Sequence, residues 1–312
     1  MDSLLLGLAA TLAFLFGWNN SSFLIGNIRG SGTLSYRAAV VISIIGLFLG
    51  VLLEGSKMAT SLAGSLVPST TGTVLFATLL VSISFTLGLT LLSLPVSFSV
   101  VMVGAFLGAT LSSSMQVNII RSEEVIAFWF LAPVATAAMT VVLYSSVTRL
   151  VTRFSLLTVD SLNRTGTVVS ALLVSYTLGA NNIGMIFGGA QAGVLEGTSR
   201  LEVLLLLVLV AAVGLATLGR GGVSGTIGDK MLALSPQGVF SAFLASSAVV
   251  WIGTQRAIPV SISQCLLGGM LGAAYTKSIT VLNRRLALET VSLWLVVPVL
   301  SFGLGYLLLR PF

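Results

Sequence analysis

Apolar residues fill this chain in long runs, separated by short breaks that contain charged residues, glycine or proline. A run of about 20 apolar residues lets a helix cross the hydrocarbon core of a bilayer, which is about 30 Å thick. The breaks delimit ten candidate segments, at about 3–27, 36–54, 73–92, 96–112, 124–148, 166–193, 201–219, 236–252, 259–276 and 288–309. The pattern predicts an all-α polytopic membrane protein in a cell membrane, without a sizeable soluble domain.

Three short motifs occur twice, in the same order and at nearly the same distance. "GWNN" at 17–20 recurs as "GANN" at 179–182, "LPVSFS" at 94–99 recurs as "IPVSIS" at 258–263, and "FWFLAP" at 128–133 recurs as "LWLVVP" at 293–298. Such self-similarity indicates that the chain is an internal duplication.

The duplication predicts two membrane repeats. We place an N-terminal repeat at 1–150, an inter-repeat loop at 151–165 and a C-terminal repeat at 166–312. Each repeat holds about five segments, and an odd number of crossings would put the second copy upside down. We therefore expect inverted repeats with broken or re-entrant helices at the centre, an architecture common among secondary transporters.

The composition supports a membrane location and gives the chain an orientation. Hydrophobic residues make up 56% of the chain and charged residues only 8%, with a net charge of +6. We assign ten of the 15 Lys and Arg residues to the loops of one side. Cytoplasmic loops carry the excess of positive charge, so we expect both termini on the outer side. The positive charge thus indicates orientation and not nucleic-acid binding.

Several kinds of chemistry are excluded by what the chain lacks. It has no histidine, so a Ser-His-Asp triad or a histidine metal site cannot form. Its one cysteine, Cys265, cannot make an internal disulfide. The acidic residues lie mostly in loops or near the ends of segments, and none lies in the middle of a broken segment. We therefore expect no enzymatic activity, no catalytic residues, no metal site and no bound cofactor.

Two pairs of adjacent asparagines interrupt apolar runs at equivalent places in the two halves. Asn19 and Asn20 lie in the first segment, Asn181 and Asn182 in the sixth, and glycines flank both pairs. A buried amide is costly unless it finds partners, and interrupted helices at membrane depth are tolerated where they line a cavity. The recurrence favours a central site, although amides and glycines can also join packed helices.

Prolines and serines open the fourth and ninth segments. Proline in the first turn of a helix loses no hydrogen bond, so each helix is expected to begin within the membrane with free backbone N–H groups. Hydroxyls lie at the same ends, from Ser97 and Ser99 in one half and from Ser261 and Ser263 in the other. A helix start with added donors is an anion site that needs no charged side chain, while an ordinary serine-capped loop is the alternative.

A glycine-rich link, "LGRGGVSGTIGDKMLALSP" at 218–236, joins two segments. It lacks the GxxxxGK[ST] pattern and a preceding strand, so a nucleotide-binding loop is a poor interpretation. We expect a close-packed loop there.

These motifs together resemble the inorganic phosphate transporter (PiT) family, whose two signature repeats read roughly GANDVAN and PVSTTH. The similarity spans both halves and includes Trp294 and Pro298 near the end of the chain. It implies secondary transport of phosphate, or of sulfate in some branches, driven by Na⁺ or H⁺, with the substrate held between the repeats. Asn19 and Asn181 correspond to the family's Asn, and Ser97 and Ser261 to its Ser.

This chain departs from the family pattern at the residues that would attract a cation. Asn20 and Asn182 stand where the family has Asp, so the resemblance makes them coupling-ion candidates without a carboxylate. Amide and carbonyl oxygens still coordinate a hard cation such as Na⁺, though less strongly than carboxylates. The loss of two negative charges would also ease the binding of an anion.

The leading hypothesis is therefore a secondary transporter of phosphate or a similar oxyanion that works by alternating access. Its substrate ligands would be Ser97, Ser99, Ser261, Ser263, Asn19 and Asn181, and its coupling ion, Na⁺ or H⁺, would be bound at Asn20 and Asn182. A sulfate permease, a passive anion channel and a non-transporting receptor on the same fold remain open as alternatives. The expected partners are the anion and the lipid bilayer, with a homodimer left open and no nucleic acid.

Overall fold

The computed structural model describes residues 2–92, 94, 97–191, 199–217, 234–277 and 284–310, and this part of the chain is helical throughout its regular structure. The helices are α1 Asp2–Gly30, α2 Tyr36–Glu54, η1 Gly55–Met58, α3 Gly72–Leu91, α4 Phe98–Ser112, α5 Ile119–Val151, α6 Leu156–Leu178, η2 Gly179–Ile183, α7 Gly184–Gln191, α8 Arg200–Thr217, α10 Pro236–Gln255, α11 Ile262–Lys277 and α12 Arg284–Leu309. Seven of the described helices are long and apolar enough to cross a membrane. The all-α membrane fold is confirmed.

Polar residues just before the helices explain where many of them begin. The side chains of Ser35, Thr71, Asn118, Ser155 and Ser235 each accept a hydrogen bond from the backbone N–H three residues later. Such caps satisfy N–H groups that have no partner within the helix. The breaks in the apolar pattern were therefore good guides to helix boundaries.

The predicted inter-repeat loop at 151–165 is wrong for most of its length. Helix α5 continues to Val151 and α6 begins at Leu156, after the cap of Ser155. Residues 156–165 form the first turns of α6, where Asp160 and Arg164 are exposed. These polar residues end the apolar run but not the helix, because a helix that emerges from the hydrocarbon can continue into water. The repeats are thus joined by a short turn.

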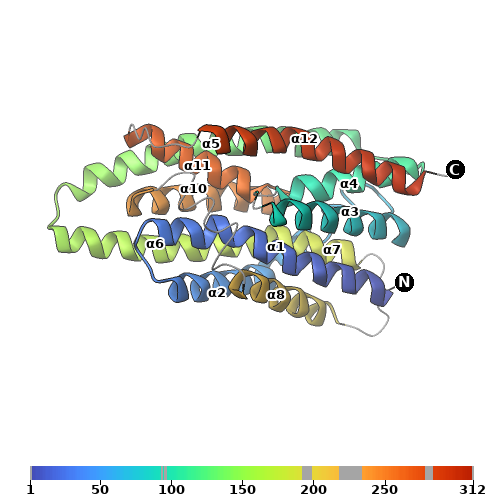
Figure 1. Cartoon of the computed structure of the whole chain (residues 1–312), viewed down its shortest axis with the longest axis horizontal. Coiled ribbons are helices and arrows are strands. Elements are labelled where there is room, and N and C mark those ends of the chain that lie inside the picture. The colour runs from blue at the N-terminus through green and yellow to red at the C-terminus, as the bar shows by residue number, and fades with distance from the viewer. Residues whose placement is uncertain are drawn as a thin grey trace.

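The two repeats pack through equivalent pairs of helices. Helix α1 lies against α8, and its counterpart α6 lies against α2. In the same way α4 packs on α12 while α11 packs on α5. Each repeat therefore supplies one helix to each of these four interfaces, as a duplicated chain related by an internal two-fold axis would. Figure 1 shows the long helices running roughly side by side along the length of the molecule.

Helices α3 and α4 form one hairpin and α10 and α11 form a second. Helix α4 has 15 residues and α11 has 16, so each spans about 22–24 Å at a rise of about 1.5 Å per residue, less than the hydrocarbon thickness. In Figure 1 the first hairpin lies to the right of the centre and the second to the left. The hairpins thus enter from opposite ends, as inverted repeats require.

Seven described helical spans are long and apolar enough to cross a membrane, and the hairpin arms α3 and α10 are among them. The two arms of each hairpin return to the same end of the molecule, which distinguishes them from α1, α2 and α5 in the first repeat (Figure 1). Helix α6 continued by α7, then α8 and α12, are their counterparts. The equivalent helix pairs of the two repeats agree with the inversion inferred from the sequence. The first and last described residues lie at the same end of the molecule (Figure 1).

Glycines allow the helices of the two repeats to approach closely. Two glycines of α4, Gly104 and Gly108, face the backbone of α12. Two glycines of α11, Gly268 and Gly272, face the backbone of α5. A Cβ atom on Gly272 would lie 2.4 Å from the carbonyl oxygen of Ala137. Small residues four apart are typical of such contacts in membranes, where backbones come together through van der Waals packing.

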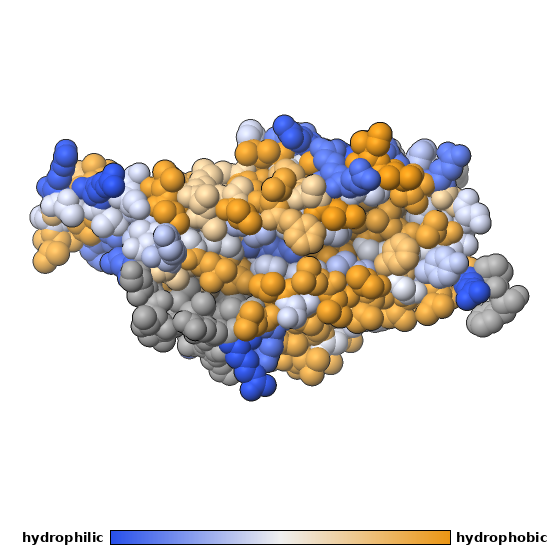
Figure 2. Space-filling model, turned by 90° about the horizontal axis from the view of Figure 1, so that it is seen from above, coloured by the Kyte–Doolittle hydropathy of each residue, from blue (hydrophilic) through white to orange (hydrophobic). Residues whose placement is uncertain are grey.

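Much of the outer surface is apolar. The outward faces of α5 and α12 carry many exposed large hydrophobic residues, among them Ile126, Phe130, Val134, Leu295 and Val299. In Figure 2 apolar side chains cover most of the middle of the visible face, while hydrophilic ones gather at its left end. An apolar belt of this kind suits contact with lipid chains.

Candidate functional site

The tips of the two hairpins meet inside the protein. The Ser97 hydroxyl, just before α4, donates to the Ser261 hydroxyl, just before α11, over 2.7 Å. Ser263 lies 3.2 Å from Ser261 on the same side, and the Ser99 hydroxyl donates to the Val260 carbonyl at 2.8 Å. The structure therefore brings together all four serines singled out in the sequence.

These four hydroxyls are closed off from solvent. Ser97 is 4% exposed, Ser261 and Ser263 are each 2% exposed, and Ser99 is fully buried. Buried hydroxyls that mainly contact one another form a polar centre in an otherwise apolar interior. The structure thus shows this centre buried among the packed helices.

The starts of α4 and α11 point toward each other at this centre. The Ser97 side chain makes no capping bond to its own helix, because its hydroxyl is directed at Ser261. Ser261 does accept a bond from the N–H of Gln264 at 3.3 Å. Two helix starts that face each other place two partial positive charges close together. An anion between them would relieve the repulsion and accept hydrogen bonds from both hairpins.

The first asparagine of each pair fastens the hairpin tip of its own repeat. The Asn19 amide donates to the Thr90 hydroxyl at 2.8 Å and to the Leu94 carbonyl at 3.2 Å. Both acceptors lie at the end of α3 or just beyond it. The first hairpin tip is therefore tied to the middle of α1.

The second repeat reproduces this arrangement. The Asn181 amide donates to the Thr254 hydroxyl at 3.0 Å and to the Ile258 carbonyl at 3.1 Å. Its oxygen accepts from the Val260 N–H, also at 3.1 Å. Both amide hydrogens of Asn181 are thus used within the protein. Its observed contacts position the tip that carries Ser261.

The second asparagine of each pair is less engaged. Asn20 donates to the Phe16 carbonyl within its own helix, 3.0 Å away. Asn182 is 1% exposed, and its Nδ2 atom finds no hydrogen-bond partner among the described residues. A buried polar atom without a partner marks a place where an ion or a water could bind.

The helices that carry the two asparagine pairs differ in regularity. Residues 179–183 form a π-helical turn between α6 and α7, of the kind often found at functional sites. Helix α1, by contrast, continues as an α-helix past Asn19 and Asn20. A break at the first pair is therefore not found, while the second pair lies in the π-helical turn.

Proline acts differently from the sequence-based expectation. Pro259 lies three residues before α11 and not in its first turn, so it shapes the extended tip between α10 and α11. Its carbonyl accepts a hydrogen bond from the Trp129 indole at 2.9 Å. Pro95, Glu196 and the glycine-rich link from 218 to 233 lie outside the described residues.

Sequence reasoning missed several residues at this centre. Thr90 and Thr254 hold the asparagines, and each lies five residues before the proline of its hairpin, a shared spacing that could have identified them. Gln264 was also passed over. It is 5% exposed and, within the described part of the chain, its Oε1 atom has no partner.

Within the described part of the chain, no charged side chain is seen to bond to the serines of the polar centre. Ser97, Ser99, Ser261 and Ser263 bond to one another, to backbone atoms and to a helix start. In the described residues, no three Cys, Asp or Glu side chains are grouped so that they could hold a metal ion. The described groups that could attract an anion here are N–H dipoles and hydroxyls.

Charges lie toward the ends of helices. Arg285, just outside the spanning part of α12, pairs with Glu289 at 2.8 Å. The hydrogen bond and the attraction of the Glu289 carboxylate raise the pKa of Arg285 above its ordinary value. This ion pair is exposed and charged, whereas the serine centre is buried and neutral.

The structure also contains an apolar cavity apart from the serines. A cavity of about 550 Å³ lies between α4, α5, α11 and α12, lined by Trp129, Pro133, Gln264, Trp294 and Pro298 among others. Its lining is overwhelmingly apolar, so it does not suit an oxyanion.

Inverted repeats, two opposed re-entrant hairpins and a buried polar centre between their tips define a membrane transporter of the inverted-repeat class. Comparison with known families then gives the particular family. The model of the phosphate transporter family matches residues 16–159 and 155–305, and the chain belongs to this family. The two matches meet near the short turn that joins the repeats.

Individual relatives are similar over almost their whole length. A protein of Methanocaldococcus jannaschii, named as a candidate phosphate permease, is 26% identical over 96% of this chain and 94% of its own. A probable low-affinity inorganic phosphate transporter of Bacillus subtilis is 22% identical, over 95% and 92%. The sulfate permease CysP of the same species is 26% identical, over 98% and 88%. A solved structure of a sodium-dependent phosphate transporter superposes with a TM-score of 0.82 at 17% identity, over 98% and 97% of the two chains, and shares the fold.

Proposed function

We propose that this protein is a secondary transporter that carries inorganic phosphate, or a similar oxyanion, by alternating access. Membership of the phosphate transporter family supports phosphate as the transported anion. The observation that carries the assignment of the site is the 2.7 Å contact between Ser97 and Ser261, where two helix starts face each other. The anion would bind between the hairpin tips and bridge the two repeats.

In this proposal the serines contact the anion. Ser97, Ser99, Ser261 and Ser263 would turn their hydroxyls from one another toward the anion, and N–H groups at the helix starts would add donors. A hydroxyl can both donate and accept, so it can serve oxyanions with or without a proton. Because the site is closed around these residues in the structure, one hairpin tip must move before the anion can enter.

The asparagines divide their roles in the same proposal. Asn19 and Asn181 act at the substrate site by holding the hairpin tips that carry Leu94 and Val260. Asn20 and Asn182 would help to bind the coupling ion, which is Na⁺ or H⁺. Rotation of the Asn182 amide would place an oxygen where Nδ2 now has no partner, and an amide oxygen is a suitable ligand for a hard cation.

Uptake of radiolabelled phosphate into proteoliposomes tests this function. We expect saturable uptake that increases when a Na⁺ gradient or a pH gradient points inward. Empty liposomes and liposomes with heat-denatured protein provide the baseline. Absence of saturable phosphate uptake under every gradient would exclude the proposal.

Sulfate is the second candidate substrate, because a sulfate permease is among the similar proteins. A site of hydroxyls and N–H groups has no carboxylate to reject the fully deprotonated sulfate ion by repulsion. We therefore expect unlabelled sulfate to compete with labelled phosphate. Uptake of sulfate with no uptake of phosphate would make sulfate the substrate, and ion currents faster than any carrier would make the protein a channel.

A further inference from the structure

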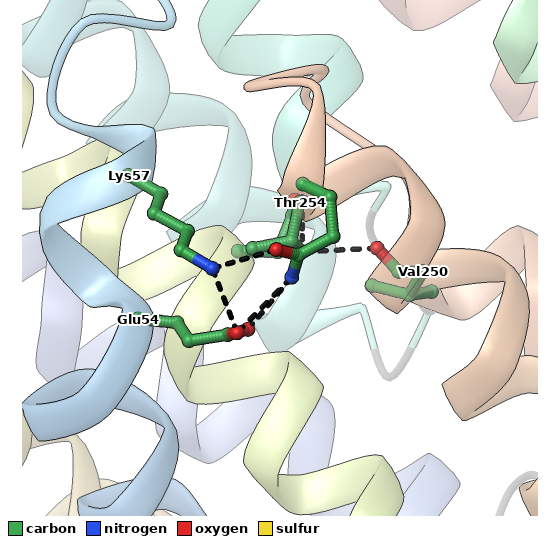
Figure 3. Close-up of polar contacts among 6 residues, drawn as sticks. Glu54, Lys57, Val250 and Thr254 are labelled. Atoms are coloured by element: carbon green, nitrogen blue, oxygen red, sulfur yellow. Dashed lines mark hydrogen bonds and ion pairs between the residues drawn. The ribbon is translucent and has the colours of Figure 1, made fainter.

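A cluster of three polar side chains joins the first repeat to the tip of the second hairpin. Glu54 ends α2, Lys57 lies in η1, and Gln255 is the last residue of α10. The Lys57 ammonium lies 2.9 Å from the Glu54 carboxylate and donates to the Gln255 oxygen at 2.6 Å. The Gln255 amide in turn donates to both Glu54 oxygens, at 3.1 and 3.0 Å. Figure 3 shows Lys57 and Glu54 reaching across to the helix that carries Thr254.

The cluster lies directly next to the bonds that fix the hairpin tip. Thr254, the neighbour of Gln255, holds the Asn181 amide at 3.0 Å. On the other side the Arg121 guanidinium, which pairs with Glu124, donates to the Arg256 carbonyl. The tip of the second hairpin is therefore fastened by α2 and η1 on one side and by α5 on the other, all from the first repeat.

The twin hairpin lacks this fastening among the described residues. With the offset of 164 that relates Ser97 to Ser261, Thr254 corresponds to Thr90 and Gln255 corresponds to Leu91. The inner bond from threonine to asparagine occurs in both halves. The outer position does not, because Leu91 cannot hydrogen bond and its side chain is 66% exposed. The two hairpin tips are thus held alike at the centre and differently at the outside.

We propose that Glu54, Lys57 and Gln255 form a latch that holds the second hairpin tip against the first repeat and keeps one side of the transport path closed. The proposal rests on alternating access as proposed above and names the residues that gate one side of the site. An ion pair whose lysine side chain is 43% exposed contributes little net stability. Such a contact can open and close reversibly. The latch acts on the site by positioning the tip that carries Ser261.

Accessibility of a single cysteine tests the latch without measuring transport. In a Cys265→Ala background, Ser261→Cys places a reporter thiol at the closed centre. A membrane-impermeant thiol reagent is applied to right-side-out and to inverted membrane vesicles, and the rate of modification is measured from each face. The variants Gln255→Leu, which copies the residue of the first hairpin, and Lys57→Met remove the latch.

We expect both variants to raise the modification rate several-fold from one face only. The charge-exchanged variant Glu54→Lys/Lys57→Glu should return the rate toward that of the reporter alone, because the ion pair is re-formed. Arg285→Gln, which breaks an exposed ion pair on α12, is the matched control and should leave both rates unchanged.

Unchanged rates in Gln255→Leu and Lys57→Met would overturn the latch, and so would an equal rise from both faces, which indicates general loosening of the fold. The test separates the latch from the proposed function. A one-sided rise in a protein that takes up no phosphate supports the latch and contradicts the function. Phosphate uptake by a protein whose latch variants show no rise in modification rate supports the function and contradicts the latch.

Discussion

At the scale of single residues, the adjacent asparagines have unequal surroundings. Asn181 satisfies both its amide hydrogens and its oxygen within the hairpin tip, whereas Asn182, its neighbour, has a buried Nδ2 with no partner in the described residues. One amide therefore holds the hairpin tip, while the other keeps a buried donor that the described residues do not use. The sequence indicated that the pairs are special, but it could not divide the roles, since the bonding partners lie more than 70 positions away.

Removal of the first asparagine should damage the site more than the fold. Asn181→Ala leaves the Val260 N–H and the Ile258 carbonyl buried and unpaired, at a cost of about 1–3 kcal/mol for each unsatisfied group. We expect initial phosphate uptake to fall by about tenfold or more, because 1.4 kcal/mol already corresponds to tenfold. The rate is measured in proteoliposomes and normalised to inserted protein.

Asn163→Ala, at a partly exposed position of α6, is the control and should keep its uptake. Uptake by Asn181→Ala equal to that of the control would show that the tip does not need this amide.

At the scale of helices, the apolar pattern predicted where the segments lie in the sequence, but not which of them form the arms of a hairpin. A run of 17–20 apolar residues fits a crossing helix and a hairpin arm equally, so 73–92 and 96–112 could not be distinguished from crossings. Recurrence of the motifs was the stronger guide, because it predicted the inversion without depending on which segments cross. The latch could not be predicted, because Glu54 and Lys57 meet Gln255 only after the two repeats have packed.

Close contacts at glycines should control the packing of α11 on α5. In Gly272→Ala the new Cβ would lie 2.4 Å from the Ala137 carbonyl oxygen, so the helices must separate. We expect a loss of about 1–3 kcal/mol, in the range for overpacked cores. A lower melting temperature of the purified protein in detergent would show it.

Gly88→Ala provides the matched control, since nothing lies within 4 Å of a Cβ at that position. Alanine is the better helix former by about 1 kcal/mol, so this variant should melt at the same or a higher temperature. If Gly272→Ala melted as high as Gly88→Ala, the close contact would not hold the helices together.

At the scale of the whole molecule, the duplication gives a nearly symmetric frame with unequal outer contacts. The equivalent helix pairs and the facing serines follow the internal two-fold relation. The latch at the second hairpin breaks it. In the proposed transport cycle the two hairpins would act as opposed gates, and the latch would hold the second of them closed.

The arrangement also makes a prediction about orientation. Both ends of the described chain lie at the same end of the molecule (Figure 1), and the distribution of Lys and Arg favours the outer side for them. Short epitope tags at the two termini should both be accessible to antibody on intact cells or spheroplasts. If both tags were accessible only after permeabilisation, the orientation would be the reverse of the predicted one. If only one tag were accessible, the two ends could not lie on the same side of the membrane.

We propose above all that an oxyanion is carried between the two facing helix starts. Its most direct test is saturable phosphate uptake by the wild type and by the Ser97→Ala/Ser261→Ala variant in proteoliposomes. We predict a rise in KM of about tenfold or more for the variant, because hydrogen bonds to a charged group contribute about 1.5–3 kcal/mol each. Ser84→Ala, an exposed serine of α3 bonded within its own helix, should leave KM unchanged. Equal KM values for the wild type and the double variant would contradict the account.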